Sequence, residues 1–271
     1  MTSSLATKCN IVIPCYNEAE RLQSSEFLQY LRSNPGISLT FVNDGSGDKT
    51  LEIMRSMQAE MLAQIDILDL SVNSGKGEAV RCGLLRAMRS GAPFVGFWDA
   101  DLATPLTAIA DLLQVLLCDP EVDIVLGSRV KLLGRHIERR PVRHYLGRLF
   151  ATCASSVLEL PVYDTQCGAK MFRVTQTVEK MFEQPFLSRW IFDVEILARY
   201  LTWGSATSER GIYEFPLYSW CDVVGSRLRS RDFFRAAAEL AKIKRCYSGR
   251  GEMGGSRNRA TAEIMGKPNG A

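Results

Sequence analysis

Histidine is scarce in this chain, and closely paired cysteines are missing. Only two histidines stand among 271 residues, and none of the eight cysteines forms a Cys-x-x-Cys pair. A structural zinc ion needs four nitrogen or sulfur ligands at close spacing, so we expect no zinc site. Scattered thiols in a chain of this length are typical of a protein in a reducing cytoplasm.

Long apolar runs are missing as well. No stretch approaches the roughly 20 apolar residues of a membrane-spanning helix, and the first residues, Met1 to Thr7, lack the apolar core of a signal peptide. We therefore expect a cytoplasmic protein, whose contact with the inner face of the membrane, if it has one, is peripheral.

Two common phosphate-binding signatures are also absent. The chain has no Gly-x-x-x-x-Gly-Lys-Ser/Thr loop, and no Gly-x-Gly-x-x-Gly follows its first apolar segment. The first absence excludes a P-loop nucleotide hydrolase, and the second disfavours a dinucleotide-binding fold.

Positive charge, by contrast, is concentrated in two regions. The net charge is +3, yet residues 225–271 carry eleven Lys or Arg against four Asp or Glu, and residues 129–148 carry seven against one. Such asymmetry indicates an anionic partner or a solvated basic face. We expect no nucleic acid, because no aromatic platform accompanies the charge.

The basic C-terminal region divides into a helix and a tail. Residues 232–247 form an amphipathic pattern with Phe233, Ala237, Leu240 and Ile243 on one face. This helix could lie on an anionic bilayer, or it could pack on the domain. Residues 248–271 are rich in Gly, Arg and polar residues, and we predict a disordered basic tail.

Apolar strands alternate with amphipathic helices through most of the chain. We predict strands at 9–14, 38–42, 65–70, 93–98, 122–126, 167–172 and 212–217, and helices at 19–33, 50–61, 78–89, 106–117, 141–160, 192–200 and 232–247. This order predicts a Rossmann-like α/β fold, with a mostly parallel sheet and helices on both faces. We expect one catalytic domain over residues 1–247.

Asp99 and Asp101 follow the strand at 93–98 directly. Two carboxylates cannot be buried there without partners, so they must face a cation or solvent. They could hold Mg²⁺ on a diphosphate, or they could form a solvated turn that caps the next helix. Other polar clusters also follow strand ends, where ligands bind in such sheets, and this favours the metal–diphosphate site.

Two of these clusters contain glycine. Gly75-Lys76-Gly77 can place backbone N–H groups and an ammonium near phosphate oxygens. Asp44 precedes a Gly-Ser turn, where its carboxylate could accept hydrogen bonds from a base edge or a ribose, or could cap the helix that begins near Asp48.

Four motifs occur together in one order: Pro14-Cys15-Tyr16-Asn17-Glu18, Asn43 to Thr50, Asn73-x-Gly-Lys-Gly and Asp99-Ala100-Asp101. As a set they resemble a family 2 glycosyltransferase of GT-A fold. The resemblance implies a nucleotide-sugar site at Pro14, Tyr16, Asn17, Glu18, Asp44, Gly45, Ser46, Gly75, Lys76, Asp99 and Ala100. It also implies Mg²⁺ or Mn²⁺ on Asp99 and Asp101. Asn43 departs from the pattern, since many relatives carry aspartate there.

The second half resembles one branch of that family. Gly127-Ser128-Arg129 and the segments 164–172 and 189–195 are similar to polyprenyl-phosphate glycosyltransferases, closest to the dolichyl-phosphate β-glucosyltransferase branch. This implies a metal-dependent inverting transferase that moves glucose from UDP-glucose to a polyprenyl phosphate. The implied acceptor residues are Arg129, Arg135, Arg139, Gln166 and Trp190, and the implied catalytic residues are Asp101, Asp193 and Arg129.

Two alternatives stay open. Relatives in eukaryotes carry an N-terminal membrane anchor that is not seen here, so the acceptor could instead be a hydroxyl of a soluble molecule or glycan. Asp193 would then be the general base within about 3 Å of that hydroxyl, whereas a phosphate monoester, with a second pKa of about 6, needs none. Asp193 could equally orient an arginine or cap a helix. The second alternative is an inactive nucleotide-sugar-binding protein.

Overall fold

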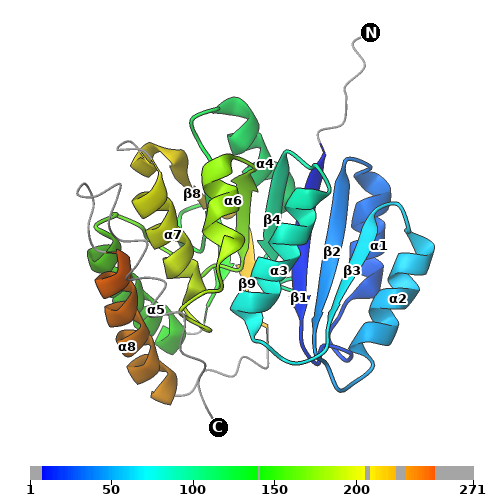
Figure 1. Cartoon of the computed structure of the whole chain (residues 1–271), viewed down its shortest axis with the longest axis horizontal. Coiled ribbons are helices and arrows are strands. Elements are labelled where there is room, and N and C mark those ends of the chain that lie inside the picture. The colour runs from blue at the N-terminus through cyan, green and yellow to red at the C-terminus, as the bar shows by residue number, and fades with distance from the viewer. Residues whose placement is uncertain (1–7, 140, 205–207, 224–229, 248–271) are drawn as a thin grey trace.

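A seven-stranded sheet forms the centre of the molecule in this computed structural model, which describes residues 8–139, 141–204, 208–223 and 230–247 (Figure 1). The strand order is β3-β2-β1-β4-β7-β5-β8. The strands are β1 (Cys9–Cys15), β2 (Ile37–Asp44), β3 (Ile65–Leu70), β4 (Phe94–Trp98), β5 (Ile124–Ser128), β7 (Ala169–Arg173) and β8 (Ile212–Pro216).

The sheet is parallel except for one strand. β1 pairs in parallel with both β2 and β4, whereas β7 runs antiparallel between β4 and β5. The chain moves from β1 outward to β3 and then returns to the other side of β1 with β4. This reversal opens a crevice at the carboxyl ends of β1 and β4, the usual ligand position in such sheets.

Helices cover both faces of the sheet and enclose two cores. α1 (Ser24–Ser33), α2 (Thr50–Glu60) and α4 (Ala108–Cys118) pack on one face. The other face is covered by α3 (Lys76–Arg89), α5 (Pro141–Leu158), α6 (Gln176–Glu183), α7 (Phe192–Trp203) and α8 (Ser230–Tyr247). Strands buried on both faces explain the continuous apolar runs of the sequence.

The close packing of α3 on β1 fixes where the crevice lies. The two elements are so close that a methyl group added to Gly83 would lie 2.3 Å from Val12 Cγ1. α3 therefore begins at Lys76 beside the carboxyl end of β1, and its first turn reaches the crevice.

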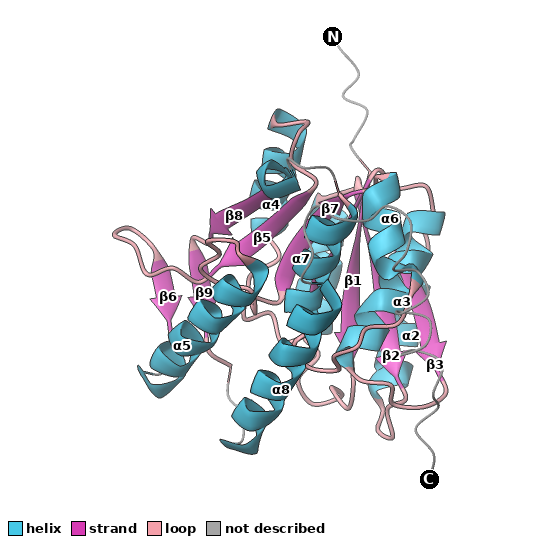
Figure 2. Ribbon diagram, turned by 60° about the vertical axis from the view of Figure 1, so that its left-hand side comes forward, coloured by secondary structure: helices cyan, strands magenta, loops and turns pink. Residues whose placement is uncertain are grey.

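A second, two-stranded sheet stands beside the last strands, next to α5 (Figure 2). β6 (His136–Glu138) pairs in parallel with β9 (Ser219–Cys221). A short 3₁₀ helix, Ser208–Gly211, leads into β8. No helix in the described part of the chain is both long and apolar enough to cross a bilayer.

The sequence predicted most of these elements, with differences that have local causes. Helix α1 begins at Ser24 rather than residue 19, because the N–H groups of Arg21 and Leu22 both donate to Glu18 O in a turn. The small sheet and α6 were not predicted, and the antiparallel direction of β7 was not anticipated. The proposed tail, 248–271, lies outside the described residues.

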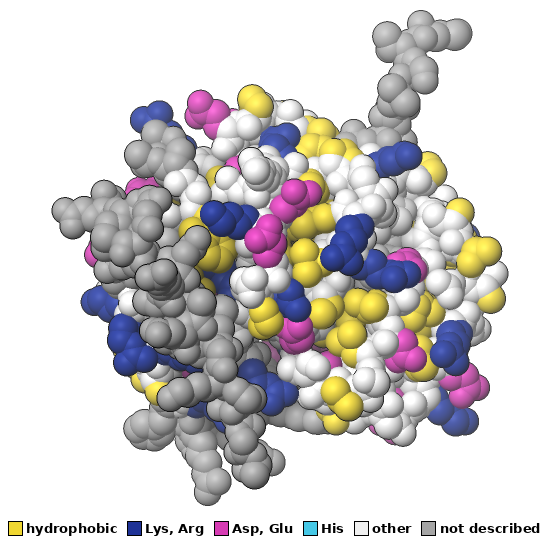
Figure 3. Space-filling view, in the orientation of Figure 1, with side chains coloured by type: hydrophobic (Ala, Val, Ile, Leu, Met, Phe, Trp, Pro, Cys, Tyr) yellow, Lys and Arg dark blue, Asp and Glu magenta, His cyan; other side chains and the backbone are white. Residues whose placement is uncertain are grey.

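Helix α8 packs on the domain through a face that includes two of the predicted residues, Leu240 and Ile243. Ala236, Leu240 and Ile243 are buried against the second core, whereas Ala237 is exposed, so its assignment to the apolar face was wrong. Basic side chains face outward, and Figure 3 shows Lys and Arg gathered at the lower left, where Figure 1 places α8. The side chain of Phe233 lies outside the described residues.

Candidate active site

The loops after β1 and β2 lock onto each other at the crevice. Asn17 N–H donates to Ser46 Oγ at 3.0 Å, and Gly47 N–H donates to Asn17 Oδ1 at 2.9 Å. Asn17 adopts a φ of 53°, and Gly45 a φ of 64°. Glycine is required at position 45, since a methyl group there would lie 2.5 Å from Asn73 N. The predicted nucleotide residues of these two loops thus form one rigid unit.

Asp44 is buried and holds a third loop. Its carboxylate accepts hydrogen bonds from Ser74 N–H at 2.7 Å and Gly75 N–H at 2.9 Å, and its carbonyl accepts one from Asn73 Nδ2 at 3.3 Å. Asp44 does not cap the helix that follows. At the start of α2, the carboxylate that accepts from a backbone N–H, that of Thr50, belongs to Asp48. Asp44 therefore fixes the position from which Lys76 enters the crevice.

Replacing Asp44 with alanine should loosen this loop. Two buried backbone N–H groups would lose their acceptor, and we expect the free energy of unfolding to fall by about 2–4 kcal/mol. Chemical denaturation measures this loss. Asp48→Ala, which removes an exposed carboxylate from the same rim, is the control and should cost less. Equal stability of Asp44→Ala and the parent chain would contradict this role.

Asp99 follows β4 and is held from two sides. Its N–H donates to Gly168 O at 3.0 Å, and its carboxylate forms an ion pair with Lys76 Nζ. A methyl group on Gly168 would lie 1.9 Å from Asp99 Oδ2, so this glycine makes room for the carboxylate.

Asp101 lies beside Asp99. Its Oδ1 accepts from Ala103 N–H at 3.1 Å. Burial and the negative charge of Asp99 raise the pKa of Asp101. Among the described residues no third Asp, Glu, His or Cys joins the pair to form a ligand cluster. Two carboxylates with open positions fit a Mg²⁺-like ion that takes its other ligands from a phosphate and water.

Lys76 sits among three carboxylates. Burial alone would lower its pKa, but the charges of Asp99, Asp193 and Asp101 outweigh that effect and raise the pKa. Lys76 therefore stays cationic beside Asp99.

Asp193 is buried in the first turn of α7 and is held by a lysine. The Nζ of Lys170, which is fully buried, forms an ion pair with Asp193 Oδ1 and donates to Cys167 O at 2.6 Å. The sequence had suggested an arginine as the partner of Asp193, and that suggestion was wrong.

Arg129, at the end of β5, is clamped by Asp164. Its Nε and Nη2 donate to the two carboxylate oxygens at 2.6 and 2.7 Å. Burial would raise the pKa of Asp164, but Arg129 outweighs it and lowers the pKa to about 2, so the pair stays charged at neutral pH. Arg129 thus offers a phosphate fewer free donors than its position in the sequence suggests.

Polar atoms without partners surround this clamp. Burial and the charge of Arg129 lower the pKa of Arg139, and both guanidinium groups lie over the Trp220 ring, at 5.2 Å for Arg129 and 5.9 Å for Arg139. Within the described residues, five buried polar atoms on the two segments that carry or follow the clamp lack a hydrogen-bond partner: Ser128 Oγ, Arg135 Nη1, Arg139 Nε, Thr165 Oγ1 and Gln166 Nε2. Buried polar atoms without partners are costly, and an anion with several oxygens or ordered water would satisfy them. We call these five residues the anion cluster.

The other predicted site residues lie at separate points. Tyr16 follows β1 and is 40% exposed, and Glu18 forms an ion pair with Arg21. Pro14 lies near the end of β1, and Ala100 lies in the turn after β4. Trp190 lies before α7 and packs against the second core, where its N–H donates to Ser188 Oγ. The sequence missed Ser128 and Thr165, although each adjoins a charged residue, Arg129 or Asp164, of a quoted motif.

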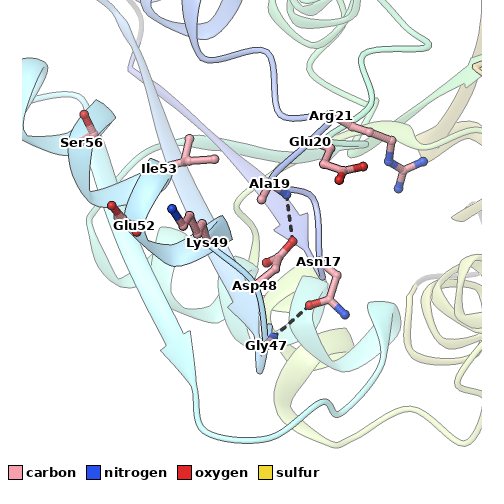
Figure 4. Close-up of a pocket in the computed structure, with 10 residues that line it drawn as sticks. All are labelled: Asn17, Ala19, Glu20, Arg21, Gly47, Asp48, Lys49, Glu52, Ile53 and Ser56. Carbon is pink, nitrogen blue, oxygen red and sulfur yellow. Dashed lines mark hydrogen bonds between the residues drawn. The ribbon is translucent and has the colours of Figure 1, made fainter.

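A cavity of about 1040 Å³ opens on the α2 side of the interlocked loops (Figure 4). Asn17 and Gly47 border it, together with Arg21, Asp48 and Lys49. It borders the predicted nucleotide residue Asn17, but its lining does not include Asp99, Asp101 or Lys76, so the chemistry is better located by the charged groups than by this cavity.

Comparison with known proteins agrees with the geometry. The model of the family described as glycosyl transferase family 2 matches residues 10–177. A dolichyl-phosphate beta-glucosyltransferase of Trichomonas vaginalis is 31% identical over 86% of this chain and 72% of its own length. The dolichyl-phosphate beta-glucosyltransferase of Saccharomyces cerevisiae is 30% identical over 88% and 74%.

Solved structures share the fold at lower identity. A crystal structure of glucosyl-3-phosphoglycerate synthase from Mycobacterium tuberculosis, in complex with Mn²⁺, UDP-glucose and phosphoglyceric acid, superposes with a TM-score of 0.62. The two sequences are 17% identical over 88% of this chain and 80% of that one. The predicted mixed α/β architecture of GT-A type is confirmed.

Proposed function

The chain belongs to glycosyl transferase family 2, and from this we propose that it transfers glucose from UDP-glucose to a polyprenyl phosphate. That it is a glycosyltransferase follows from the family. The acceptor is inferred from the anion cluster, whose five buried polar atoms have no hydrogen-bond partner among the described residues. The dolichyl-phosphate beta-glucosyltransferases of Trichomonas vaginalis and Saccharomyces cerevisiae support the same acceptor class.

The donor would lie across the carboxyl ends of β1, β2 and β4. The interlocked loops around Asn17 and Ser46 present polar groups to the nucleotide, and the positive charge of Lys76 faces the diphosphate. Asp99 and Asp101 are the residues that would hold Mg²⁺ or Mn²⁺, and such an ion supplies electrostatic stabilisation of the leaving UDP. Two solved structures of the Mycobacterium tuberculosis synthase with UDP also contain Mn²⁺ or Mg²⁺, which supports this assignment.

The acceptor phosphate would lie in the anion cluster. Its second pKa is about 6, so it is already a nucleophilic anion at neutral pH. Arg135, Arg139 and Gln166 supply N–H groups for its oxygens, and the nearby Arg129 adds positive charge. One phosphate oxygen can then attack the anomeric carbon from the side opposite the diphosphate, which gives inversion without a general base.

Asp193 is better suited to position groups than to accept a proton. One of its oxygens is already committed to the buried Lys170, and its charge lies close to Lys76. The hydroxyl-acceptor alternative needs this carboxylate free to take a proton, and the ion pair disfavours that alternative.

Substitution of Asp193 separates the two acceptors. Asp193→Asn leaves the buried positive charge of Lys170 without its partner, so we expect the free energy of unfolding to fall by about 3–5 kcal/mol. Adding Lys170→Met removes this unpaired charge and should restore most of that stability. In this double variant, we expect kcat with polyprenyl phosphate to stay within about tenfold of the parent value. A loss of more than about a thousandfold in the stably folded double variant would identify Asp193 as a general base.

Transfer itself is tested with matched acceptors. Radiolabelled UDP-glucose is incubated with Mn²⁺ and either a polyprenyl phosphate or the free polyprenol of the same length, and labelled lipid is measured. The proposal expects product from the phosphate alone. Equal product from the free alcohol, or labelled lipid from neither, would contradict it.

A further inference from the structure

Two exposed leucines form the tip of the loop that leads from β5 to β6. Leu133 is fully exposed and Leu132 is 47% exposed. Figure 2 shows this loop projecting from the body of the fold ahead of β6. Adjacent exposed leucines on a projecting tip are costly in water, and such surfaces mark contacts with a partner or a membrane.

The tip is held in place by local hydrogen bonds. Arg135 N–H donates to Leu132 O at 3.1 Å across a turn, in which Gly134 adopts a φ of 79°. His136 N–H then donates to Tyr218 O at 2.8 Å and begins the β6–β9 pairing. The two leucines are therefore presented by a defined turn whose base is fixed to the small sheet.

Basic and aromatic side chains surround the leucines. Lys131 and His136 are exposed on either side of the tip, and the Arg135 guanidinium lies 3.5 Å over the Tyr218 ring, which is 55% exposed. Apolar tips framed by cations and an interfacial aromatic ring suit a surface whose outer layer is anionic and whose interior is apolar.

Helix α8 carries the other basic surface. Its exposed described side chains include Arg235, Lys244 and Arg245, whereas Leu240 and Ile243 are buried. The described side chains of this helix therefore offer a bilayer charge without a large exposed apolar group, whereas the loop offers both.

We propose that the segment 131–135, with Tyr218, docks the protein on an anionic lipid bilayer. Leu132 and Leu133 enter the boundary between headgroups and acyl chains, while Lys131, His136 and the edge of Arg135 remain at the lipid phosphates. This inference rests on the proposed function for its purpose, because a polyprenyl phosphate is held in such a bilayer.

The tip and part of the anion cluster belong to one stretch of chain between β5 and β6. Leu132 follows Arg129 by three residues, a span of at most about 11 Å. Arg135 belongs to both, since its Nη1 is one of the buried atoms without a partner. Docking at the tip therefore brings the anion cluster to the depth of lipid phosphates, where the acceptor can enter without leaving the membrane.

Vesicle co-sedimentation tests the docking surface. The full chain is mixed with phosphatidylcholine vesicles that contain or lack phosphatidylglycerol, and the bound fraction is measured at low and high salt. We expect binding to the anionic vesicles, weakened by salt, and we expect Leu132→Ser/Leu133→Ser to reduce the partition coefficient roughly tenfold or more. Leu62→Ser, which changes a 76%-exposed leucine elsewhere on the surface, is the matched control and should bind like the parent chain.

A soluble acceptor separates docking from catalysis. With farnesyl phosphate free in solution, the double leucine variant should keep the parent kcat/KM, whereas with polyprenyl phosphate in vesicles its rate should fall with its binding. Parent-like vesicle binding by that variant would overturn the docking proposal, as would self-association of the parent chain that the same substitutions abolish. If the parent chain binds vesicles but glucosylates neither lipid phosphate, the proposed function fails and the docking surface stands.

Discussion

Asp101→Asn is expected to lower kcat/KM for sugar transfer by at least about a hundredfold while leaving the fold intact. Burial and Asp99 already raise the pKa of this residue, so the pair gains from a cation that neutralises it. The amide removes one of two charges available to a divalent ion at this point. UDP binding, measured by calorimetry with and without Mn²⁺, should lose most of its dependence on the metal.

The control for this prediction is Asp111→Asn. Asp111 lies in the first turn of α4, outside the crevice, and its amide variant should retain parent activity. Asp99→Asn should weaken metal-dependent UDP binding as well, but it also frees Lys76 from its ion pair. A parent-like gain in UDP affinity on adding Mn²⁺ to Asp101→Asn would show that these carboxylates do not hold the ion.

The sequence predicted the crevice because its cause is topological. Parallel strands place their carboxyl ends at one edge, so the clusters after β1, β2 and β4 had to meet once the alternation of strands and helices was recognised. Asp99 and Asp101 follow β4, the strand with which the chain returns to the other side of β1. This position is why a motif that is common in ordinary turns could be predicted to belong to a binding site.

Contacts made across the sheet could not be predicted in this way. β7 is a short strand of three apolar residues and two basic ones, and nothing in its five residues indicates its direction. Its antiparallel pairing puts Ala169 opposite Trp98 and so brings Gly168 against Asp99. Likewise, the commitment of Asp44 to backbone N–H groups near Gly75 depends on a distant loop, whereas the sequence offered a base edge, a ribose or a helix cap as its partner.

The contact between Gly168 and Asp99 leads to the most specific expected result. In Gly168→Ala the new methyl group would lie 1.9 Å from Asp99 Oδ2 and 2.1 Å from Cγ, so the carboxylate must move. Displacement of a reacting group by about 1 Å can cost about a hundredfold in rate. We therefore expect kcat/KM to fall about a hundredfold, with a loss of only about 1–3 kcal/mol in unfolding free energy. Gly47→Ala, whose methyl group would meet nothing within 4 Å, should be close to neutral.

A double-mutant cycle shows whether Gly168 acts through Asp99. If the methyl group harms activity only by displacing that carboxylate, Gly168→Ala should cost little more once Asp99→Asn has already removed its charge. The two effects on the activation free energy would then be strongly non-additive, as expected for residues in contact. Additive losses would mean that the methyl group disturbs another part of the crevice, such as the Lys170–Asp193 pair that follows it in β7 and α7. Because Gly168 adjoins the carboxylate of Asp99, non-additivity would also establish that activity depends on the position of that carboxylate, and not on its charge alone.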